Sequence, residues 1–220
     1  MDTPDLPFID VSRSLLYRLS KPVDQTHLRM LDSSFVTDKI FRVEYRASDG
    51  IGFGLSVNEI ELDSPIYKHF PDDESESASE DNDKEEEEKG FTVVVEDTNT
   101  SLPITPPDAA TSTTSLTHDI VGFITVKFSA WNSRLIITDI EVHPFYRRQG
   151  IGRNLINIAE RIACSRYPIR QIWLEVSNVN YPAVRSNLSM GFLVAGLDLS
   201  LYTATAAEGE FAIFLWKRVG

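Results

Sequence analysis

The sequence is poor in cysteine and has no long run of apolar residues. Only Cys164 among the 220 residues is a cysteine, which excludes a disulfide framework and predicts a reducing, cytoplasmic compartment. Apolar runs such as Phe211–Trp216 are too short to span a bilayer. Asp2 and Asp5 stand where a secretory signal would be basic, and no apolar region follows, so we expect no signal peptide and no membrane partner.

The sequence also lacks a dense basic stripe, although charge is unevenly distributed. The formal net charge is −12, and residues 72–89 carry 11 acids and two lysines, a net of −9. The rest of the chain is therefore close to balanced at −3. We therefore expect no nucleic-acid partner. Residues 72–89 contain no apolar side chain larger than Ala78, so this acidic insert is predicted to be disordered.

A second insert is predicted from residues 98–117, which are rich in Thr, Ser and Pro. Its Pro106-Pro107 pair is incompatible with a helix and with a central strand. We predict a loop here. The two inserts interrupt what otherwise reads as a single domain over residues 1–220.

Hydrophobic periodicity predicts an α/β (α+β) fold. Ile151, Leu155, Ile158 and Ile162 lie on one face of a helix from about Gly150 to Arg166. Two further helices are predicted, a short one at 23–31 and one at 183–190 that is opened by a proline and closed by a glycine. β-branched and aromatic residues predict strands at 41–47, 53–60, 91–96, 120–128, 135–142, 171–176, 192–195 and 211–217. This order indicates a mixed sheet with helices packed on it.

The segment ITDIEVHPFYRRQGIGRNL, residues 137–155, predicts an anion site. A strand ends at Val142, and an Arg-Arg-Gln-Gly-Ile-Gly run then opens a helix. The first turn of a helix offers N–H groups without intrahelical partners and a favourable dipole. Gly150 and Gly152 allow a phosphate to approach the backbone, and Arg147, Arg148 and Arg153 add charged donors.

Other chemistries are less well supported by the sequence. A Walker loop needs Lys followed by Ser or Thr, where this chain has Arg153-Asn154, and a dinucleotide fingerprint needs a third glycine. As a bare pattern, the Gly-x-Gly element also fits a tight turn. The four histidines show no metal-ligand spacing, so no metal is expected. No Gly-x-Ser-x-Gly or Cys–His signature indicates a covalent acyl-enzyme.

The RxxGxG run after a strand ending in EVHP resembles the acyl-CoA-binding motif of the GNAT N-acetyltransferases. A second resemblance follows in order: LEV at 174–176, NVNYPA at 178–183 and MGF at 190–192. The segments SFVTDKIFRVEY, SPIYKHFPDD, LEVSNVNYPA and GFLVAGLDLSLY further resemble the streptothricin acetyltransferase branch. The family fold implied is a mixed, mostly antiparallel sheet, splayed at the cofactor site, with helices on both faces.

The resemblance implies roles in binding acetyl-CoA. The backbone of Ile140 and Val142 is expected to pair with the pantetheine arm. The residues Arg147, Arg148, Gln149, Gly150, Ile151, Gly152 and Arg153 are expected to hold the pyrophosphate. Asn180 is expected to contact the same cofactor.

A primary amine is protonated at neutral pH and must lose a proton before it attacks a thioester. Asp139, Glu141 and Glu175 are the candidate acceptors, and Asp139 and Glu141 share one strand face, opposite Ile140 and Val142. Glu175 matches the glutamate of the family's LET segment and is preferred, with Asp139 next. Each could instead be a solvent-facing or ion-paired strand residue.

One position departs from the family pattern. Many GNAT enzymes place a tyrosine five residues before the final Phe of the Gly-Phe pair, where it protonates the leaving thiolate. Here that position is Asn187, which cannot act as an acid. Tyr181 and Tyr202 are the candidate replacements, and Tyr202 matches a tyrosine of the streptothricin branch; a packed aromatic is the alternative for either.

The resemblance therefore predicts an acetyl-CoA-dependent N-acetyltransferase acting on a primary amine of a small cationic molecule, with a streptothricin-like antibiotic as the first candidate. A protein N-terminus or lysine is the alternative acceptor, and a CoA-binding module without efficient catalysis is the alternative function. The chain is expected to be a monomer or a homodimer.

Overall fold

A computed structural model of the chain describes residues 6–47, 53–69, 90–103 and 116–220. Its contacts group the chain into two compact units. Unit 1 comprises Met1–Ser33 and Asp72–Ile169, and unit 2 comprises Ser34–Pro71 and Arg170–Gly220. The predicted acidic insert, 72–89, lies outside the described residues, as do residues 104–115 of the predicted loop insert.

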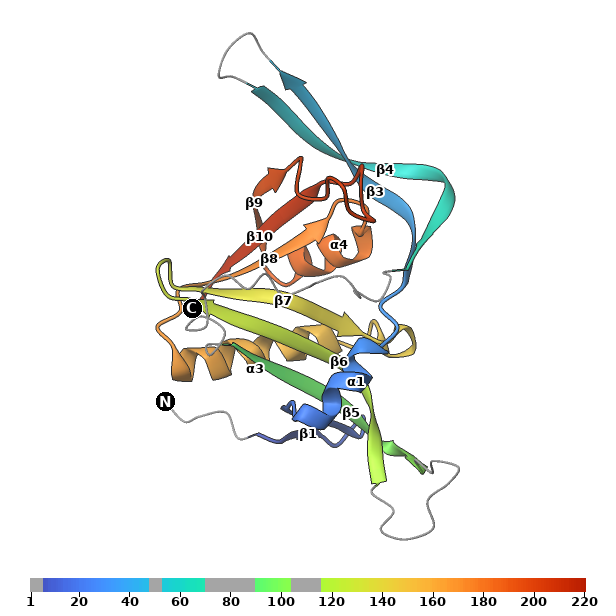
Figure 1. Cartoon of the computed structure of the whole chain (residues 1–220), viewed down its shortest axis with the longest axis vertical. Coiled ribbons are helices and arrows are strands. Elements are labelled where there is room, and N and C mark those ends of the chain that lie inside the picture. Colours follow the sequence, from blue (N-terminus) through green and yellow to red (C-terminus); the bar gives the residue numbers. More distant parts are fainter. Residues whose placement is uncertain (1–5, 48–52, 70–89, 104–115) are drawn as a thin grey trace. The chain divides into compact units, whose positions relative to one another are not determined.

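Unit 1 is built on an antiparallel sheet (Figure 1). Its strands, in spatial order, are β1 (Phe8–Asp10), β2 (Leu15–Leu19), β5 (Gly90–Pro103), β6 (Leu116–Ser129) and β7 (Arg134–Val142). The strands predicted at 91–96, 120–128 and 135–142 are confirmed. The strands β5 and β6 extend into both ends of the segment predicted as a loop, and β1 and β2 were not predicted.

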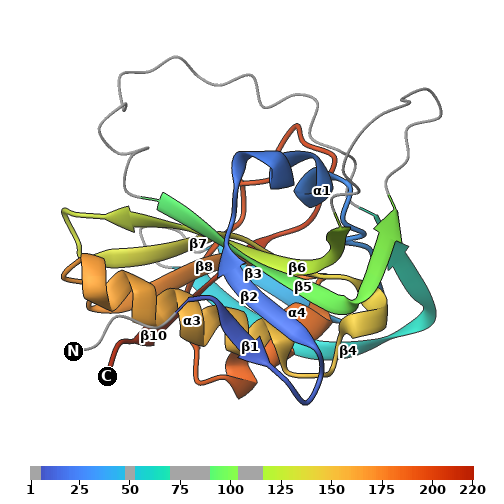
Figure 2. The same ribbon diagram turned by 90° about the horizontal axis from the view of Figure 1, so that it is seen from below.

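Helices cover both faces of this sheet. On one face, α3 (Ile151–Arg166) contacts β5, β6 and β7. The short helix α1 (Gln25–Arg29), which follows a 3-10 turn at Pro22–Asp24, contacts β6, and Figure 2 shows it on the opposite side from α3. The predicted apolar face of α3 is confirmed, because Ile151, Leu155, Ile158 and Ile162 are all buried.

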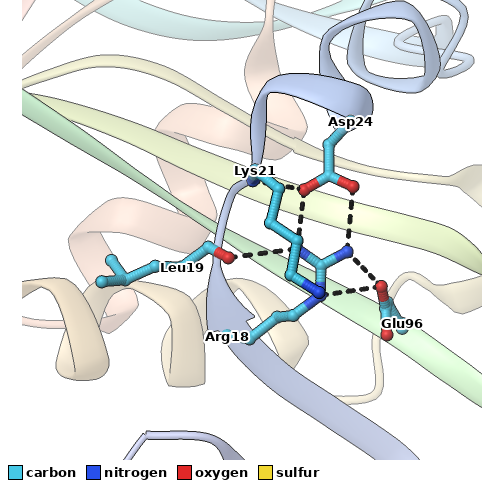
Figure 3. Close-up of polar contacts among 5 residues, drawn as sticks. All are labelled: Arg18, Leu19, Lys21, Asp24 and Glu96. Atoms are coloured by element: carbon cyan, nitrogen blue, oxygen red, sulfur yellow. Dashed lines mark hydrogen bonds and ion pairs between the residues drawn. The ribbon is translucent and has the colours of Figure 1, made fainter.

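A buried ion cluster fastens the start of this helical segment to the sheet (Figure 3). Arg18 on β2 donates to both carboxylate oxygens of Asp24, at 2.6 and 2.9 Å, and its Nε donates to Glu96 on β5 at 2.9 Å. The backbone N–H of Lys21 also donates to Asp24, at 2.6 Å. Asp24 and Glu96 are only 4% and 7% exposed, so Arg18 supplies the charge that makes their burial tolerable.

Unit 2 contains two antiparallel sheets (Figure 1). In one, β10 (Ala212–Arg218) lies between β8 (Gln171–Ser177) and β9 (Leu193–Asp198). The other is the long hairpin of β3 (Phe35–Ala47) and β4 (Phe53–Lys68). Helix α4 (Tyr181–Ser189) contacts β3, and the ring of Tyr181 stacks on that of Phe41 with centroids 5.2 Å apart.

Asn178 joins three segments of unit 2 immediately after β8. Its side chain donates to the Phe41 carbonyl and accepts from the Phe211 N–H, both at 2.7 Å. Its backbone makes a second pair of hydrogen bonds to the same two residues. A buried amide with all these groups satisfied fixes β3 and the segment before β10 against the end of β8.

Candidate active site

The connection between β7 and α3 is held at both ends. A 3-10 turn at Pro144–Tyr146 follows β7. Arg147 Nε donates to the Val142 carbonyl at 2.7 Å, and the Tyr146 hydroxyl donates to Asp97 Oδ2 on β5 at 2.8 Å. That hydrogen bond, assisted by burial, raises the pKa of Tyr146 to about 12, so the tether persists at neutral pH.

The N-terminus of α3 presents backbone donors that suit an anion. Gly150 is the N-cap, with a left-handed φ of +80° that disfavours other residues. The first helical N–H to bond back is that of Asn154, to the Gly150 carbonyl at 3.0 Å. The N–H groups of residues 151–153 therefore precede the hydrogen-bond ladder and are directed at whatever lies beyond the helix end.

Gly152, in the first turn of α3, lies beside open space. Its φ is not left-handed, and a Cβ built on it would meet no atom within 4 Å. Neither backbone strain nor packing in the described structure therefore requires glycine here. The space beside its backbone is the kind of cradle that a phosphate group fills and that a side chain would occupy.

The arginines of this turn differ in their environment. Arg147 is half-buried, and its guanidinium donates to the Val142 and Asp32 carbonyls, so it organises the turn itself. Burial lowers the pKa of Arg147, against the opposing effects of Asp32 and Glu141. Arg148 and Arg153 are exposed and add positive charge at the helix end.

Two carboxylates lie on one face of β7, in the regular stretch that follows a β-bulge. Pairing with β6 shifts between Ile137 and Asp139, so Asp139 lies opposite Thr125 and Glu141 opposite Phe123. This confirms the predicted shared face. Burial, with the nearby charge of Asp139 adding to it, raises the pKa of Glu141 to about 8. A carboxyl that titrates near neutrality is suited to accept a proton.

A second titratable pair lies in unit 2. Tyr202, in the segment between β9 and β10, donates a hydrogen bond from its hydroxyl to Oε1 of Glu175 on β8. Desolvation of the carboxyl raises the pKa of Glu175 although the residue keeps exposed surface, and the bond from Tyr202 opposes this shift. Burial and the same bond raise the pKa of Tyr202 well above its ordinary value.

The asparagines around α4 have structural partners. Asn180 is the N-cap of α4, and its side chain accepts from the Ala183 N–H at 3.2 Å. Asn187 is buried and donates to the Ala183 carbonyl at 3.0 Å. Tyr181 is hydrogen-bonded to Glu59 and stacked on Phe41. Of the two candidate tyrosines, Tyr202 is the one bonded to a predicted catalytic residue.

Two residues outside the predicted set also lie at the α3 turn. The Asp32 carbonyl accepts from Arg147 Nη2 at 3.4 Å, and Asp32 is among the charges that raise the pKa of Glu141. Arg13 donates to the Gln149 carbonyl at 2.5 Å. Both come from the first 33 residues, more than a hundred positions away, and no local pattern in the sequence connects them to the motif.

Within the described ranges, no group of three or more His, Cys, Asp or Glu side chains could hold a metal ion. The same residues include no helix long and apolar enough to cross a membrane.

Residues 57–192 match the acetyltransferase (GNAT) family. The chain belongs to the GNAT acetyltransferase family. It is 38% identical to the streptothricin acetyltransferase of Streptomyces lavendulae over 200 residues, which cover 90% of this chain and 92% of that protein. The crystal structure of nourseothricin acetyltransferase superposes with a TM-score of 0.73 at 34% identity, covering 94% of this chain and 99% of the other.

A third relative supports the fold alone. An acetyltransferase of Bacillus anthracis str. Ames, solved in complex with acetyl coenzyme A, has a TM-score of 0.65 at 21% identity and covers the same shares of the two chains. The expected GNAT fold, an open sheet of mostly antiparallel strands with a few helices, is thus confirmed.

This GNAT protein is an acetyl-CoA-dependent N-acetyltransferase. The residues at the α3 N-terminus fit its co-substrate, because acetyl-CoA is a polyanion. The helix end supplies N–H donors and a favourable dipole, and the open space at Gly152 leaves room for a phosphate group.

Proposed function

We propose that this enzyme acetylates a primary amine of a small cationic antibiotic, with streptothricin as the first candidate substrate. The observation that carries the proposal is the match to streptothricin and nourseothricin acetyltransferases over nearly the whole chain. Carboxylates on the strands support it, because they attract a cation and can accept its proton.

The α3 turn is proposed to hold acetyl-CoA. The backbone of Ile140 and Val142 would pair with the pantetheine arm. The pyrophosphate would bind the turn and first helical residues, which are Arg147, Arg148, Gln149, Gly150, Ile151, Gly152 and Arg153. Asn180 would make a further contact. When bound, acetyl-CoA supplies a thioester whose carbonyl carbon accepts a nucleophile.

The reaction then needs two proton transfers by the protein. An alkylammonium group with a pKa of about 10.4 must first give a proton to a carboxylate. The amine nitrogen next bonds to the acetyl carbon, the C–S bond breaks, and the departing thiolate takes a proton. We assign the first transfer to Glu175 and the second to Tyr202, whose raised pKa keeps it protonated at neutral pH.

Glu141 is the second candidate for the proton acceptor, and a specific observation favours it. Its pKa of about 8 matches the task, and Asp139 on the same face contributes to that shift. In this assignment Asp139 tunes the acceptor, and Glu175 keeps Tyr202 in place. The variants Glu141→Gln and Glu175→Gln separate the two assignments, since the acceptor's removal abolishes the acidic limb of the pH–rate profile.

The substrate proposal is tested by comparing specificity constants. Streptothricin, simple polyamines and peptides with free N-termini or lysines are assayed with acetyl-CoA at low and high salt. We expect streptothricin to have the highest kcat/KM and its apparent affinity to fall with ionic strength. A peptide preferred by tenfold or more contradicts the substrate assignment. Binding of acetyl-CoA without turnover of any amine would indicate a module without efficient catalysis.

A further inference from the structure

We propose that Arg13, in the turn between β1 and β2, binds a phosphate group of acetyl-CoA. This inference rests on the proposed position of the pyrophosphate at the α3 N-terminus. It adds to that site a residue lying 136 positions before Gln149 and outside the segment that matches the family.

The guanidinium of Arg13 lies directly at the anion site. Its Nη1 donates to the Gln149 carbonyl at 2.5 Å. The same atom is 3.9 Å from the position that a Cβ would take on Gly150. Arg13 thus reaches the residue that caps α3 and the one before it, which belong to the run expected to hold the pyrophosphate.

The turn that carries Arg13 is fixed in place. The N–H of Arg13 donates to the Asp10 carbonyl at 3.2 Å, and Ser14 has a left-handed φ of +55°. The Ser14 carbonyl accepts two hydrogen bonds from Thr98 on β5, one from the backbone N–H and one from the hydroxyl, both at 2.8 Å. Because β5 anchors the turn, the guanidinium is positioned before a ligand arrives.

The charges at this helix end indicate an anionic ligand. The positive end of the α3 dipole faces Arg13 and lies beside the exposed Arg148 and Arg153. Gathering cations at a helix N-terminus is unfavourable by itself. The carboxylate of Asp10 is 3.8 Å from Nη1 of Arg13 in a partly exposed pair, so it offsets only part of the charge of this guanidinium. A phosphate group satisfies both the helix N–H groups and the arginine.

Arg13 also has donors to spare for a ligand. A guanidinium carries five N–H groups. Within the described residues, the guanidinium of Arg13 contacts the Gln149 carbonyl and the Asp10 carboxylate, both through Nη1. Its side chain is 44% exposed, so the other N–H groups are accessible. The bond to Gln149 aims the side chain and leaves the rest of the guanidinium for the phosphate.

The test measures binding by calorimetry, without an amine acceptor. Arg13→Ala is compared with the wild type for acetyl-CoA, its 3′-dephospho form and S-acetylpantetheine, which has no phosphate. We expect Kd for acetyl-CoA to rise about tenfold or more, since hydrogen bonds to charged groups are lost. Affinity for S-acetylpantetheine, read from competition with acetyl-CoA, should be unchanged. If Arg13→Ala weakens binding of the 3′-dephospho form as well as of acetyl-CoA, Arg13 contacts the pyrophosphate. If it weakens binding of intact acetyl-CoA alone, Arg13 contacts the 3′-phosphate.

The matched control is Arg161→Ala, which removes the same charge from an exposed residue of α3, about 15 Å further along the helix. It should leave Kd unchanged. The proposal is overturned if Arg13→Ala binds acetyl-CoA like the wild type, or if affinity for S-acetylpantetheine falls equally, which would show that Arg13 only holds the turn. If Gly152→Val also leaves Kd unchanged, the pyrophosphate position is wrong. If Gly152→Val raises Kd but Arg13→Ala does not, the inference about Arg13 fails and the pyrophosphate position stands.

Discussion

Arg147 Nε and the Val142 carbonyl oxygen are joined by a hydrogen bond of 2.7 Å. This bond closes the connection between the end of β7 and the start of α3, and Nη2 of the same side chain reaches the Asp32 carbonyl. The neighbouring Arg148 is exposed, with a positive φ of +64°. Two adjacent arginines of one motif therefore have different roles, which mutation can separate.

We predict that Arg147→Ala lowers both thermal stability and acetyl-CoA affinity, whereas Arg148→Ala lowers affinity alone. Loss of the half-buried charged donor should cost about 1.5–3 kcal/mol, a shift of several degrees in Tm. Calorimetric Kd and thermal melts are measured for both variants. Equal Tm losses in the two would show that Arg147 does not organise the turn.

Gly152 provides a test of the anion site that does not strain the fold. Since a Cβ there meets no protein atom within 4 Å, Gly152→Val should fold with nearly unchanged Tm while its Kd for acetyl-CoA rises at least tenfold. Gly150→Val should lose stability as well, because its φ of +80° is unfavourable for a β-branched residue. Gly196→Val on β9, also without close neighbours, is the matched control and should leave Kd unchanged.

The features that could be predicted from the sequence are those formed by residues close together in the chain. The spacing of Ile151, Leu155, Ile158 and Ile162 located α3, and the turn before this helix was located because its glycines and arginines are contiguous. The strands β6 and β7, both located by composition, pair with each other across a short connection. In each case the interacting residues are close in sequence, so periodicity and turn chemistry carry the information.

Features that depend on distant contacts could not be predicted. The strands β1 and β2 are three and five residues long, too short for a clear alternation. Arg13 approaches Gln149 only because β2 pairs with β5. The pKa of Glu141 depends on burial and on Asp32, neither of which is visible along the chain. The assignment of Glu175 and Asp139 as proton acceptors remains a prediction.

Tyr202 is expected to act as the acid that protonates the thiolate. Tyr202→Phe should reduce kcat by about a hundredfold or more, in the range typical of general acid catalysis, with little change in the Kd for acetyl-CoA. Because its pKa lies well above the ordinary value, the loss should be constant from pH 6 to 9. Tyr167→Phe, which removes a hydroxyl from the ring stacked on Phe128, is the control. A kcat within twofold of the wild type would exclude the role of Tyr202.

The Arg18 cluster should make stability depend on pH in the acidic range. Burial alone would raise the pKa of Asp24, but hydrogen bonds from Arg18 and the Lys21 backbone bring it below the ordinary value. Ionised Asp24 therefore stabilises the fold above pH about 4, and this contribution is lost as pH falls through the lowered pKa. Arg18→Met should cost about 3–5 kcal/mol at pH 7 by stranding two buried carboxylates. Urea unfolding should show a smaller difference at pH 3.

Glu141 should have the opposite pH dependence. Burial and Asp139 raise its pKa to about 8, so the folded state holds its proton more tightly than the unfolded chain, where the value is about 4.3. Below pH about 4 the Glu141 carboxyl is neutral in both states and does not oppose folding. As pH rises from there to 8, the unfolded chain loses this proton while the folded state keeps it, so the free energy of unfolding decreases.

Glu141→Gln removes this penalty, because the amide cannot ionise. The variant should therefore match the wild type in Tm near pH 4.5 and exceed it increasingly up to pH 8, with a constant difference above. Asp139→Asn should give a smaller gain, since Asp139 contributes only the secondary cause of the shift. If Glu141 also accepts the substrate proton, kcat/KM of the wild type rises through pH 8 and Glu141→Gln loses both that rise and most of the activity. A more stable variant with full activity would assign the proton to another carboxylate and leave the pKa of Glu141 as a purely structural property.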